Sequence, residues 1–442
     1  MKKTLVVMRH GKAMSPAEDL HDIDRVLTEA GRMALEARLP YMLRLLKTKG
    51  STVQIWSSPA KRARQTAALL NKALQEKYVL VQKDVELHDC LWEQDVDAFL
   101  DELRASDAEF VFAVGHIPFA EDVVEDLVGA SPIFSTGALG CMDVRLLDAD
   151  APDDSLEQDE ARLLWFVQGP VAKHWNTFVQ LQAALAKSAK AVEDHREAFF
   201  ADPDDIETNH HFRTNIRRLR SLVAFVKPWQ NKEQNAEAQA ILKSIVGHTS
   251  LLRELDVFEK QVRANPDSSP ELLEICKDAA SAERARVLNI LELKQVTKSF
   301  ERAMSLVKNV VWKKRYAKHG LPKCVVRARY DAMIDSVKAD LDTLDLSDEE
   351  RTHDVRKRAK RARYVAELNT AILGADTVDV AKGMTAHQDN LGDVCDARAN
   401  IRLVDTFLQQ DLPESVKQEF AQIRAQNEDY LLEVLKPSEA AE

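Results

Sequence analysis

The feature that most constrains the fold of this chain is a single change of pattern near residue 170. Before it, short apolar runs typical of strands alternate with amphipathic stretches typical of helices. After Gly169 and Pro170 the strand pattern stops, and residues 175–435 show helical periodicity. At about 100–200 residues per domain, 442 residues suffice for two or three domains. We therefore expect one domain over residues 1–170 and a different one over residues 175–436.

Alternating strands and helices in the first part predict an α/β layer fold with a mainly parallel sheet. The second part predicts an all-α domain, with helix breaks where Pro, Gly and Asn cluster. The expected strands are 4–8, 53–57, 110–114, 139–147 and 163–168, the last two joined by an acidic hairpin tip at 148–160; the expected helices of the first part are 28–48, 60–76 and 119–128; the expected helix breaks are 202–203, 228, 265–270 and 320–322.

The composition argues against a membrane or secreted protein. No apolar run approaches the ~18 residues of a membrane span, and the five-residue apolar stretch near the start is too short for a signal peptide. The five cysteines stand singly, with no CxxC pair. This usage indicates free thiols in a reducing cytoplasm and no zinc cage. We expect a soluble cytoplasmic protein.

The net charge of -11 is unevenly distributed. Residues 1–170 contain 19 Lys and Arg against 29 Asp and Glu, whereas residues 171–442 contain 42 against 43. Basic residues are clustered in the second part, where the segment from Lys308 to Arg329 has eight of them and no acidic residue. Local patches of this kind, rather than the overall charge, decide which polyanion a protein can bind.

Polar residues suited to a phosphoryl group follow three of the expected strands. Arg9 and His10 follow the first strand, Arg62 follows the second, and His116 follows the third. Open α/β sheets place their ligands at the carboxyl ends of the strands. The sequence therefore predicts that two histidines and two arginines gather at one edge of the sheet, with donors and charges that suit phosphoryl oxygens.

Together with their neighbours, these residues resemble the histidine phosphatase superfamily, in particular its short SixA-type phosphohistidine phosphatase branch. The resemblance implies a three-layer α/β fold in which His10 is the nucleophile, forming a phosphohistidine that water hydrolyses. It implies that Arg9, Arg62 and His116 hold the phosphoryl oxygens, with no metal and no cofactor. The matching motifs span roughly residues 1–168 and are MRHGKA at 8–13, RVLTEAG at 25–31, SSPAKRARQTA at 57–67, VGHIPF at 114–119 and FSTGAL at 134–139.

No motif marks the general acid for the leaving group. Glu86 is the nearest match to the family's position, and Glu93 and Asp95 are close to it in sequence. Each of the three is alternatively a solvated surface carboxylate, since Asp and Glu are mostly exposed. A phosphoramidate leaving group is protonated more readily than an alcohol, so it can leave without a dedicated acid.

An internal repeat carries the second chemical pattern. Residues 210–220 and 353–363 both follow H-x2-R-x3-[RK]-R-x-R, 143 residues apart. On a helix, positions 0, 3, 7 and 10 of this pattern fall within an arc of about 80°. Like charges at this spacing repel one another, and a bound polyanion would relieve the repulsion. A single copy would suit a solvated face; two copies predict an anion site. The residues on this arc are His210, Arg213, Arg217 and Arg220 in the first copy and His353, Arg356, Lys360 and Arg363 in the second.

Nucleic acid is not the expected polyanion, because aromatic side chains for stacking bases and groove-reading motifs are not recognisable. The repeat resembles the CHAD family, an all-helical domain of two related bundles whose basic helices bind inorganic polyphosphate. The resemblance covers roughly residues 176–436 and implies halves at about 175–300 and 301–436. It implies that the eight residues on the arc line a polyphosphate groove. The outer contributors that we expect are Arg218, Arg361, Lys313, Lys314, Arg315, Arg327 and Arg329.

Two classes of function remain open. In the first, the chain is a phosphatase with a phosphohistidine intermediate, acting on a phosphohistidine protein or a related phosphate, whose helical domain binds polyphosphate. In the second, it is a polyphosphate-binding or granule-associated protein with a regulatory or inactive phosphatase domain. Intact Arg9, His10, Arg62 and His116 favour the enzyme. Whether polyphosphate is a substrate or only a ligand stays open.

Overall fold

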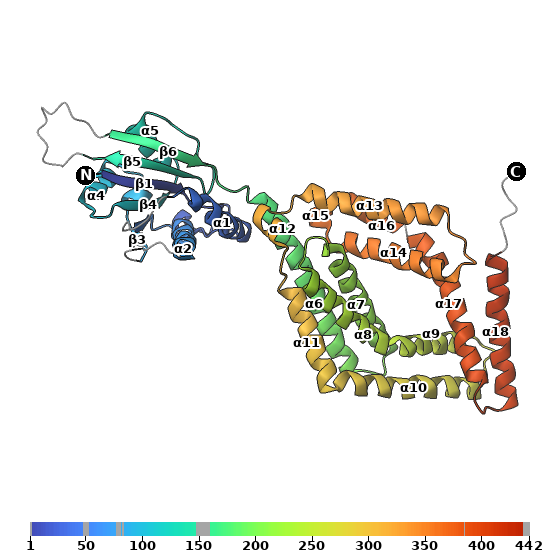
Figure 1. Cartoon of the computed structure of the whole chain (residues 1–442). Helices are drawn as coiled ribbons and strands as arrows, with labels where there is room; N and C mark the ends of the chain where they lie inside the picture. The colour runs from blue at the N-terminus through green and yellow to red at the C-terminus, as the bar shows by residue number, and fades with distance from the viewer. Residues whose placement is uncertain are drawn as a thin grey trace, which may run out of the picture. The chain divides into compact units, whose positions relative to one another are not determined.

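The computed structural model describes residues 2–46, 53–76, 81, 84–146, 160–383 and 385–435 (Figure 1). The chain forms two compact units. Unit 1 comprises Met1–Val179 with Lys314–Pro322, and unit 2 comprises Gln180–Lys313 with Lys323–Glu442. Residues 148–159 of the expected hairpin tip and residue 436, the expected end of the helical domain, lie outside the described residues.

Unit 1 is built on a six-stranded sheet with the order β3-β2-β4-β1-β5-β6. The first four strands of this order are parallel, and β5 and β6 are antiparallel to their neighbours. Met8 of β1 and Ser57 of β2 both pair with Val114 of β4, so these three strands end at the same level. The strands are β1 (Lys2–Arg9), β2 (Val53–Ser57), β3 (Glu86–Leu87), β4 (Phe110–Gly115), β5 (Leu139–Arg145) and β6 (Glu160–Val167).

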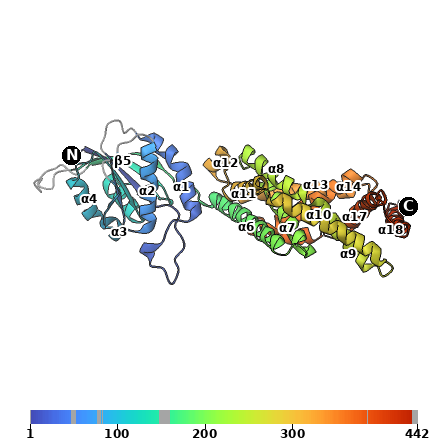
Figure 2. The ribbon, with the colours of Figure 1, turned by 90° about the horizontal axis from the view of Figure 1, so that it is seen from below.

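Helices cover both faces of this sheet, which confirms the three-layer α/β fold. Side chains alternate between the faces of a strand. Leu5 and Val7 therefore pack in one core with α3, α4 and α5, whereas Val6 and Met8 pack in another with α1 and α2. Figure 2 shows α1 and α2 on one side of the sheet and α3 and α4 on the other. The helices are α1 (Glu29–Met42), α2 (Lys61–Glu76), α3 (Cys90–Glu93), α4 (Val96–Ala105) and α5 (Phe119–Val128).

The helix expected at 28–48 is shorter than predicted. Thr28 caps it, because its side-chain oxygen accepts a hydrogen bond from the Gly31 backbone N–H, so α1 begins at Glu29. Pro40 lies within the last turn, and a single 3₁₀ turn at Leu43–Leu45 follows. The helical pattern of the sequence continues through this turn, so the sequence predicts a later helix end than the structure has.

From residue 173 onward the described residues form helices and no named strand, which confirms the predominantly helical second part. Helices end or begin at each of the predicted breaks. Asp205, Ser269 and Asp348 cap the starts of α7, α10 and α14. The helices are α6 (Lys173–Ala201), α7 (Ile206–Val226), α8 (Lys232–His248), α9 (Ser250–Ala264), α10 (Pro270–Glu292), α11 (Lys294–Lys308), α12 (Lys314–His319), α13 (Lys323–Asp342), α14 (Glu349–Leu368), α15 (Thr370–Leu373), α16 (Asp376–Gly383), α17 (Thr385–Leu408) and α18 (Glu414–Val434).

Within unit 2, the two helices that carry the repeat lie against each other. α7 packs against α14, α9 packs against α17, and α10 contacts α18 (Figure 1). Phe258, Phe407 and Phe420 stack in the core that joins α9, α17 and α18. Ile216 and Leu219 of α7, which are not on the basic arc of the repeat, are buried in the protein. Among the described residues, no helix combines the length and the apolar character that a membrane crossing requires.

Candidate functional site

His10 lies directly after β1, at the edge where β1, β2 and β4 end together. Its Nδ1 lies 2.7 Å from the Gly11 carbonyl oxygen, and a carbonyl can only accept, so Nδ1 carries the proton. Burial and the charges of Arg62, Arg9 and Arg25, opposed by that hydrogen bond, lower the pKa of His10 to about 4. At neutral pH the ring is therefore uncharged, with the lone pair on Nε2.

Arg62 lies in the first turn of α2 and contacts both histidines of this site. Its Nε donates to His10 Nε2 at 3.2 Å, which agrees with a lone pair on that nitrogen. Its Nη2 lies 3.3 Å from His116 Nδ1, and its guanidinium lies 5.6 Å from the centre of the Trp92 ring. Arg62 is 5% exposed, so its charge acts in a site shielded from water.

His116 follows β4 and completes the contact with Arg62. Since arginine only donates, His116 Nδ1 accepts, and Nε2–H donates to Ser58 Oγ at 2.8 Å. Burial, followed by the charges of His10 and Arg62, lowers the pKa of His116 to about 3. The two imidazole rings lie 5.1 Å apart, centre to centre. Both histidines are neutral at pH 7, so the positive charge here comes from arginine.

Arg9 is held by the loop that carries the FSTGAL motif. Its Nη1 donates to the Phe134 carbonyl at 2.6 Å. Gly137 of this loop has φ +81°, a backbone conformation that side chains with a Cβ rarely adopt. Its N–H lies 3.0 Å from the carbonyl oxygens of both Arg9 and His10, so the turn ties the loop to the end of β1.

The structure brings a carboxylate to this site that the sequence analysis did not consider. Asp22, in the 3₁₀ turn Asp22–Asp24, accepts from Arg62 Nη2 at 2.7 Å. It also pairs with Arg25, whose charge contributes to the low pKa of His10. Burial raises the pKa of Asp22, but hydrogen bonds from Arg25 and Arg62 outweigh it and lower the pKa below its ordinary value. Asp22 is therefore an anion that is paired with Arg62, the arginine expected to bind phosphate.

The three acid candidates lie on β3, at the end of α3 and at the start of α4. Glu86 is in β3, opposite Trp56 of β2, and β2 and β4 separate β3 from β1. Asp95 caps α4, where its side chain accepts from the Ala98 N–H. Glu93 is exposed at the end of α3. The sequence did point to Arg25, as the first residue of the RVLTEAG motif, but nothing in the spacing around Asp22 marked it.

Unit 2 contains a cavity of about 280 Å³ where both copies of the repeat meet. α7 and α14 supply three motif residues each, and α9 and α17 supply further arginines. The carboxylates on its wall are fewer than its cationic side chains. This basic cavity is lined by His210, Arg213, Arg217, His353, Arg356 and Lys360 from the repeat, by Arg253, Arg398 and Arg402 from α9 and α17, and by the acidic Glu254, Glu349 and Asp396.

The basic cavity holds more positive charge than its carboxylates offset. Burial, followed by the charges of Arg356 and Arg217, lowers the pKa of Lys360 to about 8. Burial, then the charge of Arg253, lowers the pKa of His210 to about 4. Arg356 lies 3.9 Å from its partner Asp396, a long and weak ion pair. Burial and neighbouring cations therefore both disfavour the charged forms of these side chains.

Arg213 is fixed at the back of the basic cavity. It is 5% exposed and donates to the Val246 carbonyl at 2.9 Å and to Thr249 Oγ1. Burial, followed by the charge of Arg217, lowers its pKa. These contacts hold the guanidinium in place before any ligand arrives, so it loses little conformational freedom on binding.

The other predicted residues do not line the basic cavity. Arg220 contacts Gln239, and Arg218 and Arg363 both pair with Glu367. Arg329 and Arg361 line a separate cavity of about 400 Å³ with Arg358. The remaining positions are Lys313, which donates to the Pro228 carbonyl, Arg327, which pairs with Asp331 and Asp376, and Lys314 and Arg315, which begin α12 in unit 1.

Comparison with known proteins finds a matching family model for each of the two parts of the chain. The family model "CHAD domain" matches residues 183–405, and "Histidine phosphatase superfamily (branch 1)" matches residues 5–116. No curated protein matches the chain. A putative phosphohistidine phosphatase SixA from Nakamurella multipartitia is 28% identical over 38% of this chain and 97% of its own, with a TM-score of 0.31. The CHAD domain from the plant Ricinus communis is 20% identical over 59% of this chain and 87% of its own, with a TM-score of 0.48.

Proposed function

Because the chain belongs to the CHAD domain family and carries a domain of the histidine phosphatase superfamily, we propose that it is a phosphatase that forms a phosphohistidine on His10 and binds inorganic polyphosphate in unit 2. The functional domains in this proposal are residues 1–170 and 175–436. The proposed phosphorylated substrate is a phosphohistidine protein or a related phosphate. We further propose a cytoplasmic location, with association to polyphosphate granules through the helical domain.

One observation carries the phosphatase proposal. His10 is neutral, its proton is held on Nδ1 by the Gly11 carbonyl, and its Nε2 lone pair faces Arg62. A neutral imidazole nitrogen can attack phosphorus, whereas an imidazolium cannot. Arg62 would turn its Nε–H from Nε2 to a phosphoryl oxygen as the substrate enters, and so neutralise the charge of the transferring group.

The proposed reaction has two steps. In the first, a bond forms between His10 Nε2 and phosphorus, and the bond from phosphorus to the leaving group breaks; a leaving nitrogen takes a proton from water. In the second, water attacks phosphorus, the bond to Nε2 breaks, and inorganic phosphate leaves. Arg9 and Arg62 stabilise the phosphoryl charge in both steps. Burial of Arg62 keeps bulk water from screening its charge.

The basic cavity supports the polyphosphate proposal. It joins motif residues from both copies of the repeat, and its arginines outnumber its carboxylates. Charge-assisted hydrogen bonds from arginine to phosphate oxygens are strong and geometrically specific. A linear polyphosphate offers one negative charge per inner phosphate, without bases or sugars that would need stacking platforms.

A second candidate function rests on Asp22. This carboxylate accepts from Arg62 Nη2 at 2.7 Å and so takes the place that a phosphoryl oxygen would need. In that alternative, the phosphatase domain is regulatory or inactive, and the chain acts by binding polyphosphate. The two candidates differ in whether His10 is needed for turnover.

The test compares phosphate release by the full chain and by His10→Ala, with a phosphohistidine peptide and with long-chain polyphosphate. His248→Ala, at the end of α8, serves as the matched histidine control. We expect release from at least one substrate by the wild type and the control, and none by His10→Ala. Equal release by His10→Ala would refute the nucleophile. Polyphosphate binding without release from either substrate would favour the second candidate.

The polyphosphate site is tested by replacing Arg217 and Arg356 with Gln, singly and together. Lys243→Gln, an exposed lysine of α8, removes the same charge outside the basic cavity. We expect weaker binding in each arginine variant and unchanged binding in the control. Equal affinity in the double variant, with helical content intact by circular dichroism, would place polyphosphate elsewhere.

A further inference from the structure

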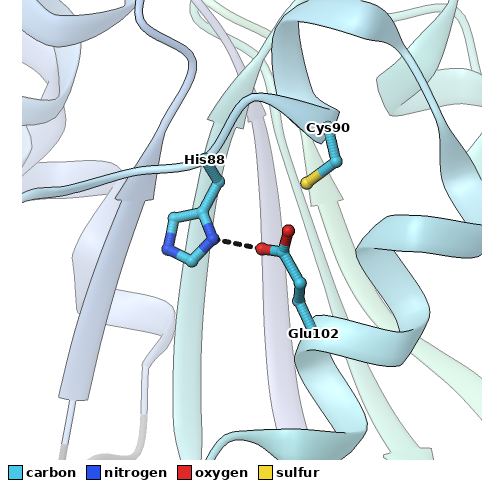
Figure 3. Close-up of side chains that lie close together, drawn as sticks. All are labelled: His88, Cys90 and Glu102. Atoms are coloured by element: carbon cyan, nitrogen blue, oxygen red, sulfur yellow. Dashed lines mark hydrogen bonds and ion pairs between the residues drawn. The ribbon is translucent and has the colours of Figure 1, made fainter.

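Three side chains that play no part in the proposed reaction converge in unit 1. His88 follows β3, Cys90 begins α3 and Glu102 lies in α4 (Figure 3). One possible ligand atom from each lies within 4.8 Å of those of the other two. Cys90 is 4% exposed, and the side chains of His88 and Glu102 are 15% and 44% exposed. The cluster is therefore buried on the cysteine side and open to solvent on the glutamate side.

Glu102 accepts hydrogen bonds from both of its neighbours in the cluster. Its Oε2 forms a hydrogen bond with His88 Nδ1. Burial, followed by the charge of Glu102 and a hydrogen bond to it, raises the pKa of Cys90 to about 12. Trp56 stacks on the His88 imidazole with ring centres 4.2 Å apart, which fixes the plane of the ring.

The three groups match the ligand preferences of one class of ion. A neutral imidazole, a thiolate and a carboxylate together carry two negative charges, which a divalent cation neutralises. Thiolate and imidazole are soft or borderline ligands, which select zinc and similar transition metals over magnesium or calcium. Zinc binds such atoms at about 2.0–2.3 Å with tetrahedral geometry, so three protein ligands leave one position for water.

We propose that His88, Cys90 and Glu102 bind a divalent transition-metal ion, for which zinc is the best match. The ion replaces the two protons through which His88 and Cys90 form hydrogen bonds with Glu102. Binding releases the Cys90 thiol proton to solvent and moves the His88 proton to Nε2. The ligand atoms must close by up to about 1 Å to reach tetrahedral spacing.

The position of the cluster gives this ion a structural role beside the candidate active site. Trp92 lies two residues after Cys90 in α3 and packs against His116, with ring centres 5.3 Å apart. The same Trp92 ring lies 5.6 Å from the Arg62 guanidinium. An ion that ties α3 to α4 would therefore fix one wall of the phosphatase site without touching the reacting atoms.

Cobalt(II) is the probe, because it replaces zinc in tetrahedral sites and reports its ligands by absorption. The full chain, freed of metal with a chelator, is titrated with Co²⁺ and then with Zn²⁺. Cys90→Ala and Glu102→Gln remove one ligand each, and Glu102→Gln preserves the size of an exposed side chain. Cys141→Ala removes a comparably buried thiol of β5 and serves as the control.

We expect one equivalent of Co²⁺ with thiolate-to-cobalt charge transfer in the near ultraviolet and strong tetrahedral bands in the visible, both displaced by Zn²⁺. Cys90→Ala should lose the charge-transfer band, Glu102→Gln should weaken binding by about 10–100-fold, and Cys141→Ala should match the wild type. Absence of the charge-transfer band in the wild type would overturn the proposal. So would Co²⁺ affinity that is unchanged in Glu102→Gln, which remains informative if Cys90→Ala fails to fold.

Discussion

The pH dependence of polyphosphate affinity, set by deprotonation of Lys360, provides a quantitative test of whether polyphosphate binds in the basic cavity. Burial and the charges of Arg356 and Arg217 lower the pKa of Lys360 to about 8. Bound phosphates would add negative charge and raise this pKa toward its ordinary value. A group whose pKa rises on binding takes up a proton from solution, so the affinity is greatest below pH 8 and is lost as the pH rises above it.

The expected size follows from the two protonation states. With a pKa of about 8, Lys360 is about nine tenths protonated at pH 7 and about one tenth protonated at pH 9. If the bound form stays protonated, the dissociation constant for polyphosphate rises about tenfold over this range, or about 1.4 kcal/mol. Long chains are the suitable ligand, because their inner phosphates do not titrate between these pH values.

The assay is calorimetric titration with long-chain polyphosphate at pH 7, 8 and 9 and constant ionic strength. Lys360→Arg keeps its charge at all three values, so its affinity should change less than about threefold. Lys360→Met cannot take up this proton, so it should bind at pH 7 more weakly than the wild type binds at pH 9, and its affinity should not change with pH over this range. A tenfold loss that persists in Lys360→Arg, or a wild type with no loss, would refute this account of the cavity.

Three further predictions concern the phosphatase domain. Since the pKa values of His10 and His116 are lowered to about 4 and 3, kcat/KM should hold from neutral pH down to about pH 4 and fall below it; a fall centred near 6.5 in a pH profile would contradict neutral, buried imidazoles. Asp22→Asn removes the anion paired with Arg62, so the inhibition constant for inorganic phosphate should drop about 2–5-fold; an unchanged or higher constant would show that Asp22 does not compete with phosphate. Gly137→Ala forces a Cβ onto a residue at φ +81°, so urea unfolding should show a loss of about 1–2 kcal/mol; a loss below about 0.5 kcal/mol would mean that the turn relaxes freely.

The layers of the phosphatase domain could be predicted because each face of its strands has its own core. The alternation of Leu5 and Val7 with Val6 and Met8 requires helices on both sides of β1. Parallel strands that end at one level then bring His10, Arg62 and His116 together, as their positions after three strands indicated. The apolar pattern of the strands and the topology of the sheet therefore predict the same positions for these three side chains.

Asp22 could not be predicted, because it lies in an irregular segment between β1 and α1. The segment has no helical or strand period, so the sequence carries no signal for where its side chains point. Its position at the site depends on a long-range contact to Arg62, to which the local pair with Arg25 is added. The same reason explains the cluster of His88, Cys90 and Glu102, in which the distance from Cys90 to Glu102 along the chain matches no common metal-binding spacing.

The repeat predicted which helix faces meet at the basic cavity, but it did not predict how far along each helix the cavity extends. Position 0 and position 7 of each copy line the basic cavity, but Arg220 and Arg363 at position 10 do not. Ten residues of helix span about 15 Å, which carries position 10 beyond the cavity. The arginines from α17 carry no repeat pattern, and only packing of α17 against α14 brings Arg398 and Arg402 to the cavity.

The most direct test of the central claim is to trap the phosphorylated chain. The full chain is mixed with a phosphorus-32-labelled phosphohistidine peptide or labelled polyphosphate, quenched in alkali within a turnover, and analysed for bound label. The proposed mechanism predicts label that is stable to alkali and lost in acid, maps to His10, and is absent from His10→Ala. Turnover by the wild type without such label, or equal label on His10→Ala, would contradict it.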